Sequence, residues 1–200
     1  MTKMEAIESI RGLDLYLLDQ ILKGRLHTGM TILDAGCGTG RNIVVLKKMG
    51  FDITGFDSNN ETIEELKHNH PSLVKDISCN SIEDFAMNNL YDYIIVNAVF
   101  HFAESHQHFE NMFNKLSKIL KPNGQLFIRM TSNIAIEKSF ITQENGTAYL
   151  PDDSYRYLLE FERLIKLMTK NELQWVEPIK TVNVADLRCM STVILQKIST

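Results

Sequence analysis

Cysteine is scarce in this sequence, and its paired histidines are not spaced as metal ligands. The three cysteines are far apart and odd in number, which excludes a disulfide framework and a Cys-x-x-Cys metal site. Two His-x-His pairs are present, but residues two apart on a helix do not face each other. No acidic residue or cysteine recurs beside these pairs at zinc-site spacing. We therefore expect no metal site at the histidines concerned, which are His68, His70, His106 and His108.

The chain also has no excess of positive charge and no long apolar run. Its formal net charge is −4, whereas proteins that bind nucleic acids cluster Lys and Arg for phosphate contacts. A membrane span needs about 20 consecutive apolar residues, and none is present. Residues 1–12 mix charged and polar side chains and lack the apolar region of a signal peptide. We expect no nucleic-acid partner, no membrane partner and a cytoplasmic location.

What the sequence does contain is a regular alternation of apolar and amphipathic segments. The 200 residues are 44% hydrophobic and 23% charged, which is ordinary for a globular domain with a buried core. Apolar periodicity predicts helices over residues 5–23, 41–49, 61–69, 107–120 and 155–172. Short apolar runs predict strands over residues 31–33, 51–56, 73–78, 91–97, 125–130, 175–184 and 190–198. The first helix would turn five residues inward, namely Ile7, Ile10, Leu13, Leu17 and Leu18.

This alternation predicts an α/β fold. We expect a three-layer sandwich, in which helices cover both faces of a seven-stranded, mostly parallel sheet. A tight hairpin around Asp186 would make the last strand antiparallel. Residues 1–200 would then form a single domain.

The segment over residues 131–154 interrupts the alternation. It is polar, and it is long enough for a lid or an inserted hairpin. Because it follows the strand over 125–130, we expect it to close over a bound ligand through Glu137, Phe140 and Tyr149. A surface connection with no role in binding is the alternative.

Residues 34–40, Asp-Ala-Gly-Cys-Gly-Thr-Gly, join the first predicted strand to a helix. Gly36, Gly38 and Gly40 leave backbone N–H groups open to a ligand. In a dinucleotide-binding fingerprint the third glycine comes one residue later, where this chain has Arg41. The carboxylate of Asp34 would repel a pyrophosphate but could hold an ammonium group. The loop therefore suits a cationic or zwitterionic cofactor, and a plain glycine-rich turn is the alternative.

Polar residues follow three other predicted strands. Asp57, Ser81 and Asn97 each come just past a strand end. Because the carboxyl ends of parallel strands meet at one edge of a sheet, we expect these residues to share a site with the glycine loop. The Asp57 carboxylate can accept hydrogen bonds from both hydroxyls of a ribose. Its alternative role is to cap the helix that follows.

The heptapeptide over residues 34–40 resembles motif I of the class I, Rossmann-like, S-adenosylmethionine-dependent methyltransferases. The resemblance implies that this loop wraps the methionine part of S-adenosyl-L-methionine. Residues 80–85 take the place of the adenine-binding motif, with Ser81 where an aspartate is usual. As a turn residue, Ser81 would have no adenine role. The implied cofactor-binding residues are Asp34, Gly36, Gly38, Gly40, Asp57, Ser58, Ser81, Ile82 and Asn97.

The residues after the fourth predicted strand resemble the fourth motif of this family. There, His101 matches a histidine often found in small-molecule methyltransferases, so it is the first candidate for a catalytic base. The alternative is a histidine packed between Phe100 and Phe102. The resemblance implies methyl transfer to a small-molecule acceptor. A non-catalytic S-adenosylmethionine-binding regulatory protein is an alternative, and an NAD-dependent oxidoreductase is disfavoured by the glycine spacing and Asp34.

Overall fold

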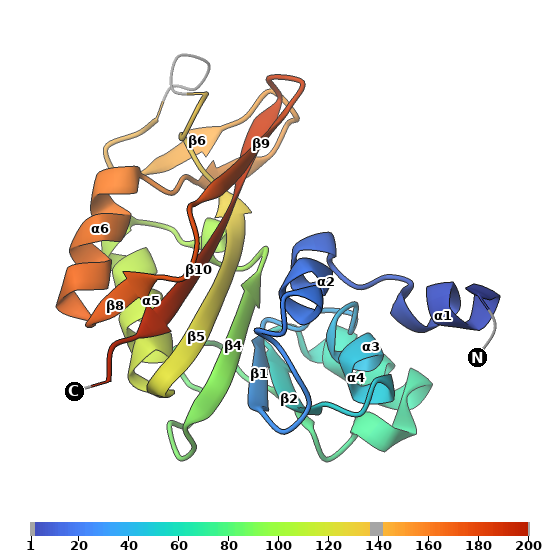
Figure 1. Ribbon diagram of the computed structural model, residues 1–200. Coiled ribbons are helices and arrows are strands. Elements are labelled where there is room, and N and C mark those ends of the chain that lie inside the picture. Colours follow the sequence, from blue (N-terminus) through green and yellow to red (C-terminus); the bar gives the residue numbers. More distant parts are fainter. Residues whose placement is uncertain (1–2, 137–141, 200) are drawn as a thin grey trace. The chain divides into compact units, whose positions relative to one another are not determined.

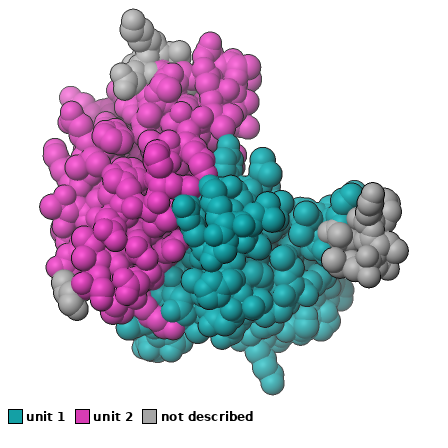
Figure 2. All heavy atoms as spheres, viewed as in Figure 1, with its two compact units in different colours: residues 1–93 teal, residues 94–200 magenta. Residues whose placement is uncertain are grey.

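The computed structural model describes residues 3–136 and 142–199. The chain divides into two compact units, residues 1–93 (unit 1) and residues 94–200 (unit 2), shown in teal and magenta in Figure 2. The division falls inside strand β4 (Tyr91–Asn97), whose bounds are those predicted from the sequence. The fold is α/β with a mostly parallel central sheet, which confirms the predicted fold class.

Unit 1 is built from strands that alternate with helices. Its three parallel strands, in the order β3-β2-β1, are β1 (Thr31–Ala35), β2 (Asp52–Asp57) and β3 (Ile77–Cys79). The helices that contact β2 are α3 (Ile43–Lys48) and α4 (Asn60–Asn69), and a 3₁₀ turn follows at Pro71–Leu73. Apolar side chains of β1 and β2 are buried, among them Leu33, Ile53 and Phe56. The ends of β1, β2, α3 and α4 lie within two residues of their predicted positions. The strand predicted over 73–78 is wrong at its start, because the 3₁₀ turn ends at Leu73 and β3 begins only at Ile77.

The predicted helix over residues 5–23 is wrong in one respect, because the structure has two helices there. They are α1 (Lys3–Ile10) and α2 (Leu15–Leu22). Gly12 interrupts the chain with φ +92°, and the Asp14 carboxylate then caps α2 by accepting from the Tyr16 N–H at 2.9 Å. Ile7, predicted to face inward, is 62% exposed, because the break turns α1 away from the direction of α2.

Unit 2 holds the antiparallel part of the fold. Its strand order is β4-β5-β10-β8, with β9 paired to β10, and the strands are β5 (Leu120–Thr131), β8 (Leu173–Trp175), β9 (Lys180–Val184) and β10 (Arg188–Lys197). Strand β10 runs antiparallel to β5, β8 and β9, which confirms the antiparallel last strand. Helices α5 (His106–Lys118) and α6 (Phe161–Lys170) contact each other, and Figure 1 shows them side by side.

Three predicted boundaries in unit 2 are wrong. The helix predicted over 155–172 begins only at Phe161, because residues 155–157 form strand β7 (Tyr155–Tyr157). This strand pairs with β6 (Thr147–Tyr149) in a separate two-stranded sheet. The strand predicted over 175–184 is divided between β8 and β9. The strand predicted over 125–130 begins earlier, at Leu120, and Asn123 within it has φ +63°.

An aromatic cluster anchors the 3₁₀ turn Phe100–Phe102 in unit 2. The Phe100 ring is fully buried and packs edge-on against Phe109 at 5.3 Å between centroids. Phe109 in turn stacks on Tyr157 at 4.9 Å. The cluster therefore holds the turn that carries His101 against helix α5 and strand β7.

The described residues contain no helix that is both long enough and apolar enough to cross a membrane. They also contain no group of three or more His, Cys, Asp or Glu side chains arranged to hold a metal ion.

Candidate functional site

The glycine loop, residues 34–40, begins in β1 and turns over the end of β2. The Gly36 and Cys37 N–H groups both donate to the Phe56 carbonyl, at 2.8 and 2.9 Å. Further along the loop, the Gly38 N–H donates to the Asp57 carboxylate at 2.9 Å. Two of the predicted site residues, Gly38 and Asp57, are thus joined directly by the fold.

The glycines of this loop serve different purposes. Gly38 has φ +51°, and a Cβ added there would meet no atom within 4 Å, so the space beside it is open. Gly40 has φ +86°, but a Cβ there would overlap the Leu66 side chain and approach Val44 Cγ2 to 2.9 Å. Gly40 therefore allows the loop to pack against helix α4, whereas no side chain fills the space beside Gly38.

Asp57 uses both carboxylate oxygens to shape the loop. One oxygen accepts from Gly38, and the other accepts from the Asn59 N–H at 2.9 Å. Helix α4 is capped by Asn59, whose side chain accepts from the Thr62 N–H at 3.0 Å. The alternative role of Asp57 as the helix cap is therefore wrong. A carboxylate has about four acceptor positions, so Asp57 still has capacity for ribose hydroxyls. Ser58 follows it on the exposed surface.

Asp34 is a carboxylate buried without a full set of partners. Its side chain is only 1% exposed, and its Oδ2 atom has no hydrogen-bond partner among the described residues. Burial raises the pKa of Asp34 to about 7, a backbone hydrogen bond from Ile43 opposes that rise, and the charge of Asp57 adds to it. A buried carboxylate with an unsatisfied oxygen is costly unless a cation reaches it. This environment fits the ammonium group predicted for the cofactor.

Ser81 closes a local turn. Its hydroxyl donates to Asp84 Oδ2 at 2.8 Å and accepts from the Asp84 N–H at 3.1 Å. These contacts are those of the turn-residue alternative, while the adenine role stays a prediction. The next residue, Ile82, is 4% exposed, and Phe56 stacks on Phe85 at 4.3 Å between ring centroids.

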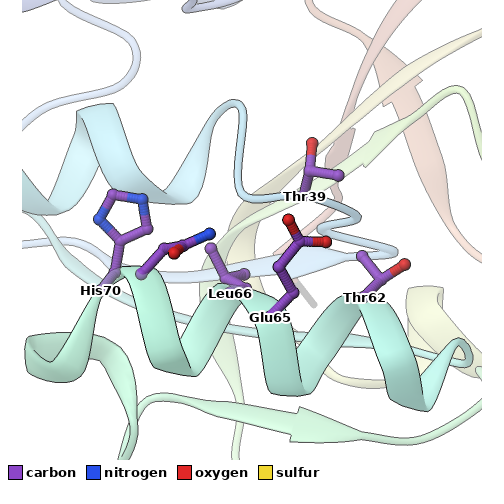
Figure 3. A pocket seen from close by; sticks show the side chains of 6 residues that line it. Thr39, Thr62, Glu65, Leu66 and His70 are labelled. Atoms are coloured by element: carbon purple, nitrogen blue, oxygen red, sulfur yellow. The ribbon is translucent and has the colours of Figure 1, made fainter.

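A small cavity lies between the glycine loop and helix α4 in unit 1. Figure 3 shows Thr39 of the loop above the helix, with Thr62, Glu65, Leu66 and His70 along the helix. The cavity has a volume of about 50 Å³. This space suits one or two water molecules and is too small for an adenosine.

In unit 2, Asn97 and His101 each have a buried side-chain atom without a hydrogen-bond partner among the described residues. The atoms are Asn97 Oδ1 and His101 Nδ1. The His101 side chain is 8% exposed, and its ring packs edge-on to Phe102 at 4.5 Å. Burial, together with the charges of Arg156, Arg188 and Arg129, lowers the pKa of His101 to about 4. The imidazole is therefore neutral at pH 7.

His101 lines a cavity of about 450 Å³ that lies entirely within unit 2. We call it the arginine pocket. Its wall is contributed by the 3₁₀ turn Phe100–Phe102, by β5, by the hairpin of β6 and β7, and by β9 and β10. The lining residues are Ala98, His101, Arg129, Thr131, Asp152, Ser154, Arg156, Val184, Arg188 and Met190.

The charges of the arginine pocket are partly paired. Arg188 Nη1 lies 2.6 Å from Asp152 Oδ2. A hydrogen bond from Ser154 and the Arg188 guanidinium lower the pKa of Asp152, so its carboxylate is ionised at neutral pH. The Arg156 guanidinium carbon lies 4.9 Å above the centre of the Phe102 ring. Three guanidinium groups thus share the cavity with one carboxylate and a neutral imidazole.

Comparison with known proteins decides the family. Residues 11–176 match the family model of the methyltransferase domain. The chain belongs to this methyltransferase family. A probable S-adenosyl-L-methionine-dependent methyltransferase, TehB of Haemophilus influenzae, is 36% identical over 91 residues, which are 42% of this chain and 30% of that relative. The predicted family and its cofactor, S-adenosyl-L-methionine, are confirmed.

Two further similarities extend over more of this methyltransferase chain. The ubiquinone biosynthesis O-methyltransferase of Rickettsia akari is 25% identical over 170 residues, which cover 80% of this chain and 65% of that protein. A crystal structure of an S-adenosylmethionine-dependent methyltransferase from Methanosarcina mazei has a TM-score of 0.76 at 19% identity, covering 94% of this chain and 100% of the other. The latter shows the shared fold. The chain spans 30% to 65% of the length of the two curated relatives.

Sequence reasoning about this methyltransferase missed most of the arginine pocket. Arg129, Arg156 and Arg188 are far apart in the sequence, and none lies in a recognisable motif. Asp152 and Ser154 fall within the predicted lid segment. Of the lid residues expected to touch a ligand, Glu137 and Phe140 lie outside the described residues. Tyr149 is 64% exposed and donates to Asp153 at 3.2 Å.

Proposed function

We propose that the chain transfers a methyl group from S-adenosyl-L-methionine to a small-molecule acceptor. The observation that carries this proposal is the buried Asp34 carboxylate, which has an oxygen without a hydrogen-bond partner among the described residues and belongs to the same loop as Gly38. We also propose that residues 1–200 act as one methyltransferase domain. The family match over residues 11–176 supports this, since it includes parts of both units.

The cofactor would be held by residues of unit 1. Asp34 would bind the ammonium group, because a cation satisfies its unpaired buried oxygen. Gly38 would let the cofactor approach the loop backbone, and Asp57 would accept hydrogen bonds from the ribose hydroxyls. When bound, S-adenosylmethionine supplies an electrophilic methyl group on a positively charged sulfur. The protein must then align an acceptor with that methyl group, and such alignment alone can supply several orders of magnitude in rate.

The acceptor would be held in the arginine pocket. Its volume of about 450 Å³ lies within the usual range for small-ligand sites. By its name, the Rickettsia akari relative methylates a small molecule of ubiquinone biosynthesis. His101 would accept a proton from the acceptor, since its imidazole is neutral at pH 7 and has an unpaired Nδ1 atom. The hairpin of β6 and β7 would act as the lid, because it contributes part of the pocket wall.

Binding and methyl release together test this function. Calorimetry should show that S-adenosylhomocysteine binds the full chain and that NAD does not. A methyl-release assay with S-adenosylmethionine and a panel of small metabolites should then show turnover with one chemical class. Binding without turnover by any acceptor would indicate the regulatory alternative, and binding of NAD alone would indicate the oxidoreductase.

A further inference from the structure

We propose that the methyl acceptor carries an oxyanion group, a carboxylate or a phosphate, that binds the guanidinium groups of the arginine pocket. This inference rests on the proposed function for the pocket's role in catalysis. Binding of the anion itself is independent of the proposed function, because it depends only on residues of unit 2.

The first argument is the charge of the pocket wall. Arg129, Arg156 and Arg188 line one cavity, and Asp152 is the only acidic residue among the described residues that line it. Asp152 is paired with Arg188, and positively charged side chains are in excess among the described lining residues. Like charges around a shared cavity repel one another, so an anion that enters this cavity would be stabilised. The whole chain, by contrast, has a net charge of −4, so the excess is local to the pocket.

The second argument is the way the arginines are held. Arg129 lies on β5, Arg156 on β7 and Arg188 on β10, so three separate strands direct guanidinium groups to the same cavity. The Arg156 side chain is supported by the Phe102 ring and by a bond of 2.8 Å from its Nη1 to the Tyr155 carbonyl. A guanidinium held in place can donate two parallel hydrogen bonds to a carboxylate or phosphate. The pocket is therefore built for an oxyanion, and a neutral acceptor would leave these donors poorly matched.

The third argument is the state of His101. Its side chain is buried, lines the pocket and has an Nδ1 atom without a hydrogen-bond partner in the part of the chain that the structure describes. The charged groups on the described part of the pocket wall that it shares are the three arginines and Asp152. An oxyanion bound to the arginines would offset their positive charge and so favour the protonated imidazole. The anionic part of the acceptor would thus make His101 a stronger base when the acceptor is bound.

Binding of matched probes tests this inference. Benzoate, phenyl phosphate and neutral benzamide would be titrated into the full chain by calorimetry, with and without saturating S-adenosylhomocysteine. At least one of the two anions should bind at least about tenfold more tightly than benzamide, as expected for hydrogen bonds between charged groups. The tighter anion identifies the oxyanion as a carboxylate or a phosphate. Equal binding of all three, or no binding of either anion, would overturn the inference.

Two variants locate the anion. R156Q and R188Q should each weaken anion binding at least about tenfold, because each removes a charged donor of the pocket. R11Q is the matched control, since Arg11 is an exposed residue of unit 1 whose partner is Glu8. Unchanged affinity in both pocket variants would overturn the assignment. Retained binding of S-adenosylhomocysteine shows that a variant is folded.

A pH titration of the His101 ring by NMR supplies a second readout. Benzoate or phenyl phosphate should raise the pKa of His101 from about 4 toward its ordinary value of 6.5. R156Q should raise it without any anion. If the pKa of His101 does not change when the anion binds, the claim that the anion makes His101 a stronger base is wrong. Absence of S-adenosylhomocysteine binding would refute the proposed function instead, while anion binding is measured independently of it.

Discussion

The two units of this methyltransferase carry sites of opposite charge. In unit 1 the glycine loop is accompanied by carboxylates, Asp34 and Asp57, and in unit 2 the pocket is lined by three arginines. An acidic site suits a cofactor with an ammonium group and a positively charged sulfur, whereas a basic site suits an oxyanion. Under the proposed function, this difference in charge would direct the cofactor to unit 1 and the acceptor to unit 2.

Burial also shifts the pKa values of ionisable groups at the two sites in opposite directions. Burial raises the pKa of Asp34 to about 7 and lowers that of His101 to about 4, so burial favours the neutral form in both cases. A cation bound beside Asp34 would lower the pKa of that carboxyl, and an anion bound beside His101 would raise the pKa of that imidazole. Four experiments would break or sharpen this comparison, and the largest effect is expected in unit 1.

The substitution Gly38→Val should reduce S-adenosylhomocysteine affinity below detection, at least about 100-fold. A valine there would fill the open space beside the loop and would have to adopt φ +51°. Calorimetry measures the loss. Gly24→Val is the matched control, because Gly24 also has positive φ, at +68°, and open space around its Cβ position. Normal binding by Gly38→Val would show that this loop does not hold the cofactor.

The pH dependence of stability should have opposite signs in the two units. Asp34 has a raised pKa in the folded state, so its contribution is fully present below pH 3.8 and is lost as pH rises to about 7. His101 has a lowered pKa, so its contribution is fully present above pH 6.5 and is lost as pH falls to about 4. The two effects are on the order of 4 and 3 kcal/mol at most.

Urea unfolding of the ligand-free chain at several pH values would measure both effects. Relative to the parent chain, Asp34→Asn should gain stability as pH rises from 4 to 7, and His101→Gln should gain stability as pH falls from 6.5 to 4. Asp52→Asn, at the exposed start of β2, is the control for loss of a carboxylate. If the curves of both variants run parallel to that of the parent chain, neither group is perturbed as described.

Asp57→Ala should weaken S-adenosylhomocysteine binding by about 1.5–3 kcal/mol, the range for hydrogen bonds to a charged group. The fold should survive, because helix α4 keeps its own cap at Asn59. Part of the loss would come from the loop, since Asp57 holds the Gly38 N–H. Calorimetry gives the affinity, and Asp52→Ala on the same strand serves as control. An unchanged affinity would remove Asp57 from the site.

The smallest effect is expected at the proposed lid. Asp152, Ser154 and Arg156 line the arginine pocket, so backbone amides over residues 142–157 should exchange more slowly with deuterium when phenyl phosphate or benzoate is bound. Hydrogen exchange with S-adenosylhomocysteine alone is the comparison and should leave this segment unchanged. Equal exchange rates in every state would show that the segment is a surface connection with no role in binding.

The sequence by itself determined the glycine turn of this protein and its family. The strand, the glycine turn and the following helix are local in the chain, so the order Asp34, Gly36, Gly38 and Gly40 predicts both the turn and the family. The strand β4 was predicted with the bounds that the structure has, because it is a continuous apolar run. The break at Gly12 was missed, because the apolar period continues across it and only packing shows where each half lies.

The tertiary structure alone decided how the arginine pocket is assembled. Arg129, Arg156 and Arg188 are brought to one cavity by the pairing of β10 with β5 and by the hairpin that carries β7. No local pattern marks them, since long-range strand pairing places them together. The neutral state of His101 has the same origin, because burial and the charges of those arginines set its pKa. Likewise, only the backbone geometry shows that Asn59 rather than Asp57 caps helix α4, which leaves Asp57 to hold the glycine loop.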